Sequence, residues 1–450
     1  MNLRQSTTSH AGMIRLSTSE FMSTTKANIP VAGEQSTNKA ALITVTTLFF
    51  MWGLLTCLND ILVPHLKSIF DLNYAEAMLI QFAFFSAYFF FSIPSGKVIN
   101  WIGYKKTMVA GLFTMGLGAF LFIPAASVPS FPLFLVALLV LATGITSLQV
   151  SANPYVAVLG PAATASSRLN LTQAFNSLGT TIAPFLGSLF ILSSSPKGMD
   201  EVRQMAPLAR QAYRLQEASS VKLPYLGLSL ALFALGIVIA KFKLPAIREA
   251  EAHGAAGSRA AKSVWKYRHL VLGAVGIFVY VGAEVSIGGF LANYISQPAI
   301  GNMSVRVAAR YVSLYWGGAM VGRFIGAEIL QKVTTGKVLG TAAIIASSLV
   351  CTSMLTSGHV AMAAILLVGL FNSVMFPSIF TLGLAELGPL TGEGSGVLVM
   401  AIVGGAVIPV LEGVLADRVG IQHAFLPVAL CYLYIVYYAF RGSRPRPATS

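Results

Sequence analysis

Charged residues are scarce in this chain. Only 10% of its 450 residues are Asp, Glu, Lys or Arg, and 55% are hydrophobic, whereas soluble globular proteins carry about 25% charged residues. This shortage excludes a soluble domain. A net charge of +14 could indicate nucleic-acid binding in another composition, but apolar runs of about 20 residues or more dominate this one. We therefore interpret the excess of cations as membrane topology and expect no nucleic-acid partner.

Cysteine is equally rare. Cys57, Cys351 and Cys431 lie far apart inside apolar runs, which argues against a disulfide framework and against a cysteine-based metal site. The chain also lacks the H-E-x-x-H zinc motif, a glycine-rich phosphate loop and a nucleophile elbow. We therefore expect neither enzymatic activity nor a bound cofactor or metal.

Twelve apolar runs follow residue 39, each long enough to cross a bilayer core of about 30 Å as a helix. Six precede a polar, basic stretch and six follow it. We predict helices because the runs lack the alternation of a membrane β-barrel. The runs cover 40–66, 76–98, 106–127, 131–158, 168–193, 223–242, 269–296, 304–330, 337–356, 360–384, 394–416 and 422–440.

The predicted organisation has five parts. A disordered cytoplasmic tail (1–39) precedes a six-helix half (40–242), and a cytoplasmic linker (243–268) leads to a second six-helix half (269–440) and a tail (441–450). The first segment is rich in Ser and Thr and has no continuous apolar core, so it is not a cleavable signal peptide. Of the 30 Lys and Arg residues, 21 fall on the side of both termini and nine on the other. The positive-inside rule therefore places both termini in the cytoplasm.

The two halves share landmarks at a nearly constant offset, as duplicated transporter halves do. Pro154 recurs as Pro377 after 223 residues, and Gly179 recurs as Gly404 after 225. We infer an internal duplication, and two rocking halves around a central site predict alternating access.

A G-x-x-x-[ND]-x-x-G spacing also occurs once in each half. It runs from Gly96 to Gly103 and from Gly413 to Gly420, and it looks like the helix-turn signature of the major facilitator superfamily. The first copy has Asn100 where that signature usually has Asp. A tight turn with small residues for close packing is the alternative explanation.

Acidic residues deep in the predicted spans are especially few. Each is a functional candidate, because a charge at the bilayer centre costs about 2.5 to 3.5 kcal/mol. Asp60 and Glu284 are 224 residues apart, which matches the repeat, and we predict that they couple transport to a cation. A structural carboxylate held by hydrogen bonds between helices is the alternative for each. We expect Glu328, Glu412 and Asp417, near span ends, to be interfacial anchors.

Uncharged polar side chains form a second candidate set. Spacings of three or four residues put the amides of the fourth and fifth spans on shared helix faces. Amides offer donors and acceptors to hydroxyl groups, and aromatic faces suit the apolar side of a sugar ring. Hydrogen bonds between helices are the alternative for each amide. The predicted sugar-binding residues are Asn59, Gln149, Asn153, Gln173, Asn176, Asn372, Trp52, Phe85 and Trp316.

Several stretches carry a resemblance to a known family, among them FFMWGLLTCLNDILVPHLKSIF (49–70), GITSLQVSANPYVAVLGP (144–161) and SRLNLTQAFNSLGTTIAP (167–184). From about residue 40 to residue 440 the chain resembles the bacterial glucose/galactose permeases of the fucose permease family. The resemblance implies an all-α membrane protein with the major facilitator fold, twelve transmembrane helices and two pseudo-symmetric halves. It also implies a sugar symporter driven by protons or sodium ions.

The resemblance bears on three polar positions. Fucose permeases carry an Asp that Asp60 matches, a Glu where this chain has Gln149, and a Gln where it has Glu284. The second carboxylate thus lies in the C-terminal half, as in the glucose/galactose branch. We expect a monomeric hexose importer of the bacterial inner membrane. The alternatives are a permease for fucose or another monosaccharide, an uncoupled facilitator and a membrane sugar sensor.

Overall fold

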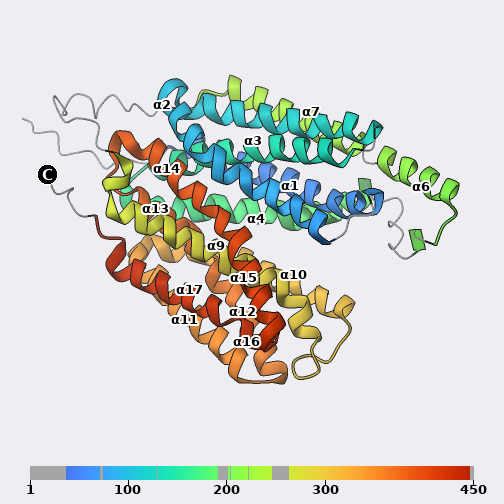
Figure 1. Cartoon of the computed structure of the whole chain (residues 1–450). Coiled ribbons are helices and arrows are strands. Elements are labelled where there is room, and N and C mark those ends of the chain that lie inside the picture. Colours follow the sequence, from blue (N-terminus) through green and yellow to red (C-terminus); the bar gives the residue numbers. More distant parts are fainter. Residues whose placement is uncertain are drawn as a thin grey trace, which may run out of the picture. The chain divides into compact units, whose positions relative to one another are not determined.

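The described part of the chain is built of helices and contains no strand (Figure 1). It is a computed structural model that describes residues 37–70, 74–128, 130–190, 201–202, 204–220, 222–245 and 263–445, without the side chains of 58–70, 74–79, 81, 185–190, 214 and 217–220. The predicted tails and linker fall largely outside these ranges, so their boundaries remain predictions.

Where the structure describes them, the twelve predicted runs coincide largely with helical chain. In a bilayer the backbone must satisfy its hydrogen bonds within the segment, which a long apolar run achieves as a helix. The first half contains α1 (Lys39–Phe70), α2 (Tyr74–Ser127), α3 (Phe131–Val158), α4 (Ala165–Phe190), α6 (Pro207–Ser220) and α7 (Lys222–Lys241). The second contains α9 (Arg268–Ser296), α10 (Val305–Lys332), α11 (Thr335–Leu355), α12 (Gly358–Asn372), α13 (Met375–Leu384), α14 (Thr391–Met400), α15 (Gly404–Val419), α16 (Ile421–Ala424) and α17 (Leu426–Tyr437).

Nine helical segments of the described residues are long and apolar enough to cross a membrane by length and composition. One of them, 82–127, contains most of two predicted runs. The runs 168–193 and 304–330 fall on α4 and α10, which are helical but carry more polar side chains. Polar side chains on membrane helices usually face other helices or a cavity, so α4 and α10 are candidates to line the interior.

Two equivalent turns support the internal duplication. Gly103 separates the two arms of α2 with φ 80° and ψ 165°, and Gly420 separates α15 from α16 with φ 82° and ψ 154°. Glycine adopts a positive φ without steric cost because it has no Cβ. The last glycine of each G-x-x-x-[ND]-x-x-G copy therefore forms the same backbone turn.

The repeat landmarks also pack alike. A Cβ at Gly179 of α4 would collide with the carbonyl oxygen of Phe50 in α1, and a Cβ at Gly404 of α15 would collide with that of Phe278 in α9. Small residues let two membrane helices approach this closely. In each half, therefore, the first helix meets the helix that bears the equivalent glycine.

Helices α1 to α7 gather in one bundle and helices α9 to α17 in another (Figure 1). The bundles meet where α2 packs against α14 and α4 packs against α10. The duplication relates the first arm of α2 to α10, and it relates α4 to the segment containing α14 and α15. The two contacts are consequently equivalent, which is the pseudo-symmetry that parallel repeats produce.

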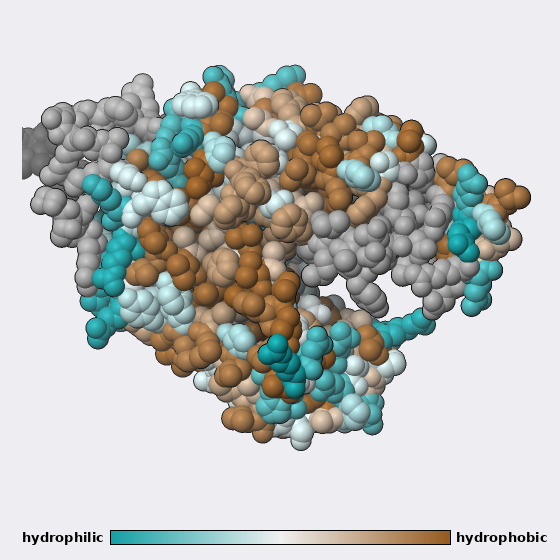
Figure 2. All heavy atoms as spheres, viewed as in Figure 1, coloured by the Kyte–Doolittle hydropathy of each residue, from teal (hydrophilic) through white to brown (hydrophobic). Residues whose placement is uncertain are grey.

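Apolar side chains cover the sides of the helices (Figure 2). Phe82 in α2, Leu230 in α7, Ile325 in α10 and Leu430 in α17 all project large exposed side chains. In a soluble protein such a surface would cause aggregation, whereas lipid solvates it.

Candidate functional site

Two of the predicted residues, Asn59 and Asp60, lie in the stretch of α1 whose side chains are outside the described residues. Their roles remain predictions. The other predicted side chains are described, and they fall on helices of both halves.

Three amides of the first half lie near one another on α3 and α4. Gln173 donates from Nε2 to Oδ1 of Asn153 over 3.3 Å, and Gln149 donates to the hydroxyl of Tyr88 in α2 over 2.7 Å. Asn153 is fully buried, yet its Nδ2 has no hydrogen-bond partner. A buried donor without an acceptor is costly, so a hydroxyl oxygen that reached this group would satisfy it.

Asn176 makes a different kind of bond. Its Nδ2 donates to the main-chain oxygen of Phe49 over 2.9 Å, at the place where Gly53 of α1 touches the backbone of α4. The Asn176 amide therefore forms a hydrogen bond between two helices. This is the structural alternative to sugar binding that we considered for each amide.

The three predicted aromatic residues differ in exposure. Trp52 and Phe85 are buried, and Phe85 reaches from α2 to Gly405 of α15 in the other half. Trp316 is 42% exposed and lies against Gly288. Phe85 is thus placed between the halves, where a central ligand would lie.

Asn372 is the centre of a hydrogen-bond network in the second half. It is fully buried at the end of α12. Its Nδ2 donates to the hydroxyl of Tyr315, and its Oδ1 accepts from the hydroxyl of Tyr432, each over 2.8 Å. Its main-chain oxygen lies 3.1 Å from the hydroxyl of Tyr280. The network joins four helices and holds Tyr280 in a fixed position.

Glu284 belongs to the same network. Its Oε1 lies 2.8 Å from the Tyr280 hydroxyl, and the side chain is half-buried. Tyr280 therefore faces two acceptors, the carboxylate and the carbonyl oxygen of Asn372, with a single proton to donate. A proton on Glu284 completes both bonds, because the carboxyl then donates to Tyr280 and Tyr280 donates to Asn372.

Arg323 is an interior polar residue that the sequence prediction did not include among the site candidates. The guanidinium donates to the hydroxyl of Ser177 in α4, and the main-chain oxygen of Arg323 accepts from Asn170 over 2.7 Å. The guanidinium also lies within electrostatic range of Glu284. Arg323 lies inside the apolar run 304–330, and that position could have marked it as an intramembrane cation.

The expectation for Glu412 is wrong. This residue is fully buried in α15, because α15 turns it toward neighbouring helices instead of the interface. Glu328 is exposed instead, and its side chain pairs with Lys332 over 2.9 Å, so its role as an interfacial anchor stays a prediction. Asp417 is exposed as well.

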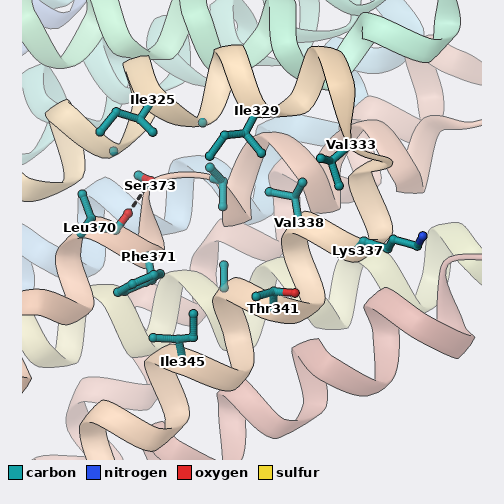
Figure 3. A pocket seen from close by; sticks show the side chains of 14 residues that line it. Ile325, Ile329, Val333, Lys337, Val338, Thr341, Ile345, Leu370, Phe371 and Ser373 are labelled. Atoms are coloured by element: carbon teal, nitrogen blue, oxygen red, sulfur yellow. Dashed lines mark hydrogen bonds between the residues drawn. The ribbon is translucent and has the colours of Figure 1, made fainter.

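Two cavities lie away from the predicted sugar-binding residues. One, of about 320 Å³, lies between α10, α11 and α12, and Figure 3 shows apolar side chains such as Ile325, Ile329 and Leu370 around it, with Lys337 at one end. The other, of about 430 Å³, lies beside Ser166. Among the described residues, no predicted sugar-binding residue lines either cavity. The lining of the first cavity is apolar, which does not suit a polyol.

The two halves are held together at one end by short polar contacts. Ser166 bonds to Thr335 over 2.9 Å and to Thr381 over 2.5 Å. Ser167 donates to the carbonyl oxygen of Ala327 over 2.6 Å, and Ser395 donates to that of Val150 over 2.7 Å. These residues lie near the loops that carry most of the predicted cytoplasmic cations. The halves are therefore closed at that end.

Comparison with known proteins matches residues 41–402 to the Major Facilitator Superfamily. A glucose/galactose transporter of Brucella abortus is 51% identical over 420 residues, with 93% of this chain and 98% of the relative covered. The crystal structure of the Escherichia coli fucose:proton symporter superposes with a TM-score of 0.83 at 34% identity, covering 90% of this chain and 98% of that one. A second crystal structure, of the transporter FucP in the outward conformation, gives a TM-score of 0.81 at 34% identity, covering 88% and 97%.

Proposed function

Because the chain belongs to the major facilitator superfamily, we propose that it imports glucose or galactose by proton symport with alternating access. It is a multi-pass membrane transporter and not an enzyme. The name of the Brucella relative supports the substrate, since the two chains align over nearly their whole length. The proposal places the protein in the bacterial inner membrane with both termini in the cytoplasm, which the distribution of Lys and Arg supports.

The observation that carries the proposal is the pairing of Tyr280 with two acceptors. Glu284 Oε1 and the Asn372 carbonyl oxygen both lie within hydrogen-bond distance of one hydroxyl, which favours a protonated Glu284 in this conformation. A carboxyl group that gains and loses a proton as the surroundings change is what proton coupling requires. Arg323 supplies a cation within electrostatic range of the carboxylate form of Glu284.

The sugar would bind between the halves. Asn153 offers a buried donor that has no partner, and Gln149 and Gln173 lie on the same pair of helices. Buried aromatic rings at Trp52 and Phe85 suit the apolar side of a pyranose. Closure at the predicted cytoplasmic end, together with the similarity to an outward-conformation structure, supports a conformation that receives sugar from outside.

Uptake by the purified protein in proteoliposomes tests this function. Labelled glucose, galactose and fucose are offered in parallel, with a proton gradient and a sodium gradient imposed separately. We expect concentrative uptake of glucose and galactose with the proton gradient alone. Uptake that follows only the sodium gradient would contradict proton coupling, and a preference for fucose would contradict the substrate.

Two variants test the coupling residues. We expect Asp60→Asn and Glu284→Gln each to abolish uphill uptake while exchange of labelled for unlabelled sugar continues, because exchange needs no net proton movement. Glu328→Gln is the matched control, since Glu328 is exposed and pairs with Lys332. Wild-type concentrative uptake by either of the first two variants would refute its coupling role.

A further inference from the structure

Glu412 is a buried carboxyl group with no bonding partner. Neither of its two carboxyl oxygens is accessible to solvent, and neither forms a hydrogen bond. Ser286 of α9 lies beside it, and the Ser286 hydroxyl is also buried without a partner. Two polar groups of facing helices thus lie within reach of each other in an apolar environment, without a hydrogen bond of ordinary geometry between them.

The packing of α9 against α15 explains this position. Gly404 touches the backbone of Phe278, and Ile408 fills the space beside Gly282. Each step of four residues along α15 matches a step of four along α9, so the next pair is Ser286 and Glu412. Side chains four apart share a helix face, and Glu412 is therefore directed at α9 by the register that the two glycines set.

No cation among the described residues faces Glu412. Besides Ser286 on α9, the groups within its electrostatic range are Cys431 and Tyr432 of α17, which are ordinarily neutral near pH 7. Phe85 is the side chain that α2 brings to α15, at Gly405. The charged and titratable side chains of α15 and α16, Asp417, Arg418 and His423, are exposed. An unpaired buried carboxylate is strongly disfavoured, so Glu412 carries either a proton or a bound cation here.

The small number of oxygen atoms around Glu412 favours a bound proton over a bound metal cation. Metal cations with oxygen ligands take about six or more of them, whereas this site offers the two carboxyl oxygens and Ser286 Oγ. The nearby Tyr432 hydroxyl is already used by Asn372, over 2.8 Å. A protonated carboxyl needs a single acceptor, and the Ser286 hydroxyl beside it can serve as that acceptor.

Tyr432 connects this site to the Asn372 network. It lies within electrostatic range of both Glu284 and Glu412. We propose that Glu412 is a second proton-binding carboxyl group of the C-terminal half, protonated in this conformation and exchanging its proton with water when that half rearranges during transport. Its part in transport rests on the proposed symport, whereas its protonation does not.

Infrared difference spectroscopy on the full-length protein in proteoliposomes tests the protonation directly. We expect the absorption band of protonated carboxyl groups at neutral pH to lose one component in Glu412→Gln. The component should shift in frequency but persist in Glu412→Asp, which keeps a carboxyl group at this position. This second variant keeps the test valid if Glu412→Gln does not fold. Glu328→Gln is the matched control and should leave the band unchanged. An unchanged band in Glu412→Gln, or a component that disappears on adding sodium ions at constant pH, would overturn the proposal.

Transport supplies the second measurement. We expect Glu412→Gln to exchange labelled for unlabelled sugar at nearly the wild-type rate, but to lose the change in uptake rate between mildly acidic and mildly alkaline medium. A wild-type pH profile in this variant would show that Glu412 exchanges no proton during transport. If the wild-type protein shows the infrared component but no proton-driven uptake, the proposed symport fails while the protonation of Glu412 stands.

Discussion

Asn100 donates a hydrogen bond from Nδ2 to Oε1 of Glu393 over 3.2 Å, across the two halves of the protein. Asn100 occupies the position where the signature of the superfamily usually has Asp. An Asp here would face the Glu393 carboxylate, whereas Asn can donate to it. The substitution therefore converts a repulsive contact into an attractive one at the end where the halves are closed.

Asn100→Asp should open this end. The change replaces a hydrogen bond by two like charges, at a cost of about 1 to 2 kcal/mol near the surface. We expect faster labelling of a cysteine introduced at Ala165, which lines the nearby cavity. The double variant Asn100→Asp with Glu393→Gln restores an acceptor and a donor, and it should label at nearly the original rate. Equal labelling of the two variants would show that the contact does not hold the halves together.

Substitutions of Asn153 and Asn176 should have different effects, the first on sugar binding and the second on the stability of the fold. Asn153 has a free buried donor, so Asn153→Ala should weaken sugar binding about tenfold, which corresponds to about 1.4 kcal/mol. Asn176 donates to the backbone of α1, so Asn176→Ala should lower the melting temperature and leave affinity nearly unchanged. Calorimetric titration with galactose and thermal unfolding measure the two effects. Similar losses of sugar affinity in both variants would contradict this difference and would indicate that both amides bind the sugar.

Tyr280→Phe should uncouple proton movement from sugar movement. The variant removes the single hydroxyl that Glu284 and the Asn372 carbonyl oxygen share, and leaving that buried oxygen without a donor costs about 1 to 3 kcal/mol. We expect loss of uphill uptake together with a lower melting temperature. Tyr438→Phe is the control, because its hydroxyl bonds to the carbonyl oxygen of His269 outside the network. If Tyr280→Phe keeps its proton-driven uptake, the shared hydroxyl has no role in coupling.

Arg323→Lys should slow transport although the charge is kept. A lysine has no planar guanidinium to bond Ser177 while facing Glu284, and we expect uptake to fall about tenfold, or about 1.4 kcal/mol in activation free energy. Ser177→Ala removes the hydroxyl and keeps the guanidinium, so it should retain most of the uptake. A larger defect in Ser177→Ala than in Arg323→Lys would place the essential function in the hydroxyl.

Much of the fold could be predicted from the sequence because membrane helices leave a strong local signal. A run of about 20 apolar residues must form a helix to satisfy its backbone, and the described part of every predicted run is largely helical. The repeat was also visible, because Gly103 and Gly420 end the two copies of one spacing, and both adopt the positive φ that glycine takes without steric cost. These features depend on neighbours along the chain.

The roles of single polar residues depend on neighbours in space. Hydropathy gives the depth of a residue along its helix but not the direction in which its side chain points. Glu412 and Glu328 both looked like span-end carboxylates, yet one is sealed between helices and the other is exposed.

The sequence by itself thus determined the class of protein, the positions of the long apolar helical runs and many of the intramembrane polar residues, although not Arg323 or Glu412. The tertiary structure alone decided which of them meet: Asn176 bonds a backbone while Asn153 has a free donor, Arg323 turns inward, and Glu412 faces Ser286. The physical reason is that side-chain partners are set by helix rotation and crossing. In these helices both follow from close contacts between glycines and distant backbones, which no local pattern records.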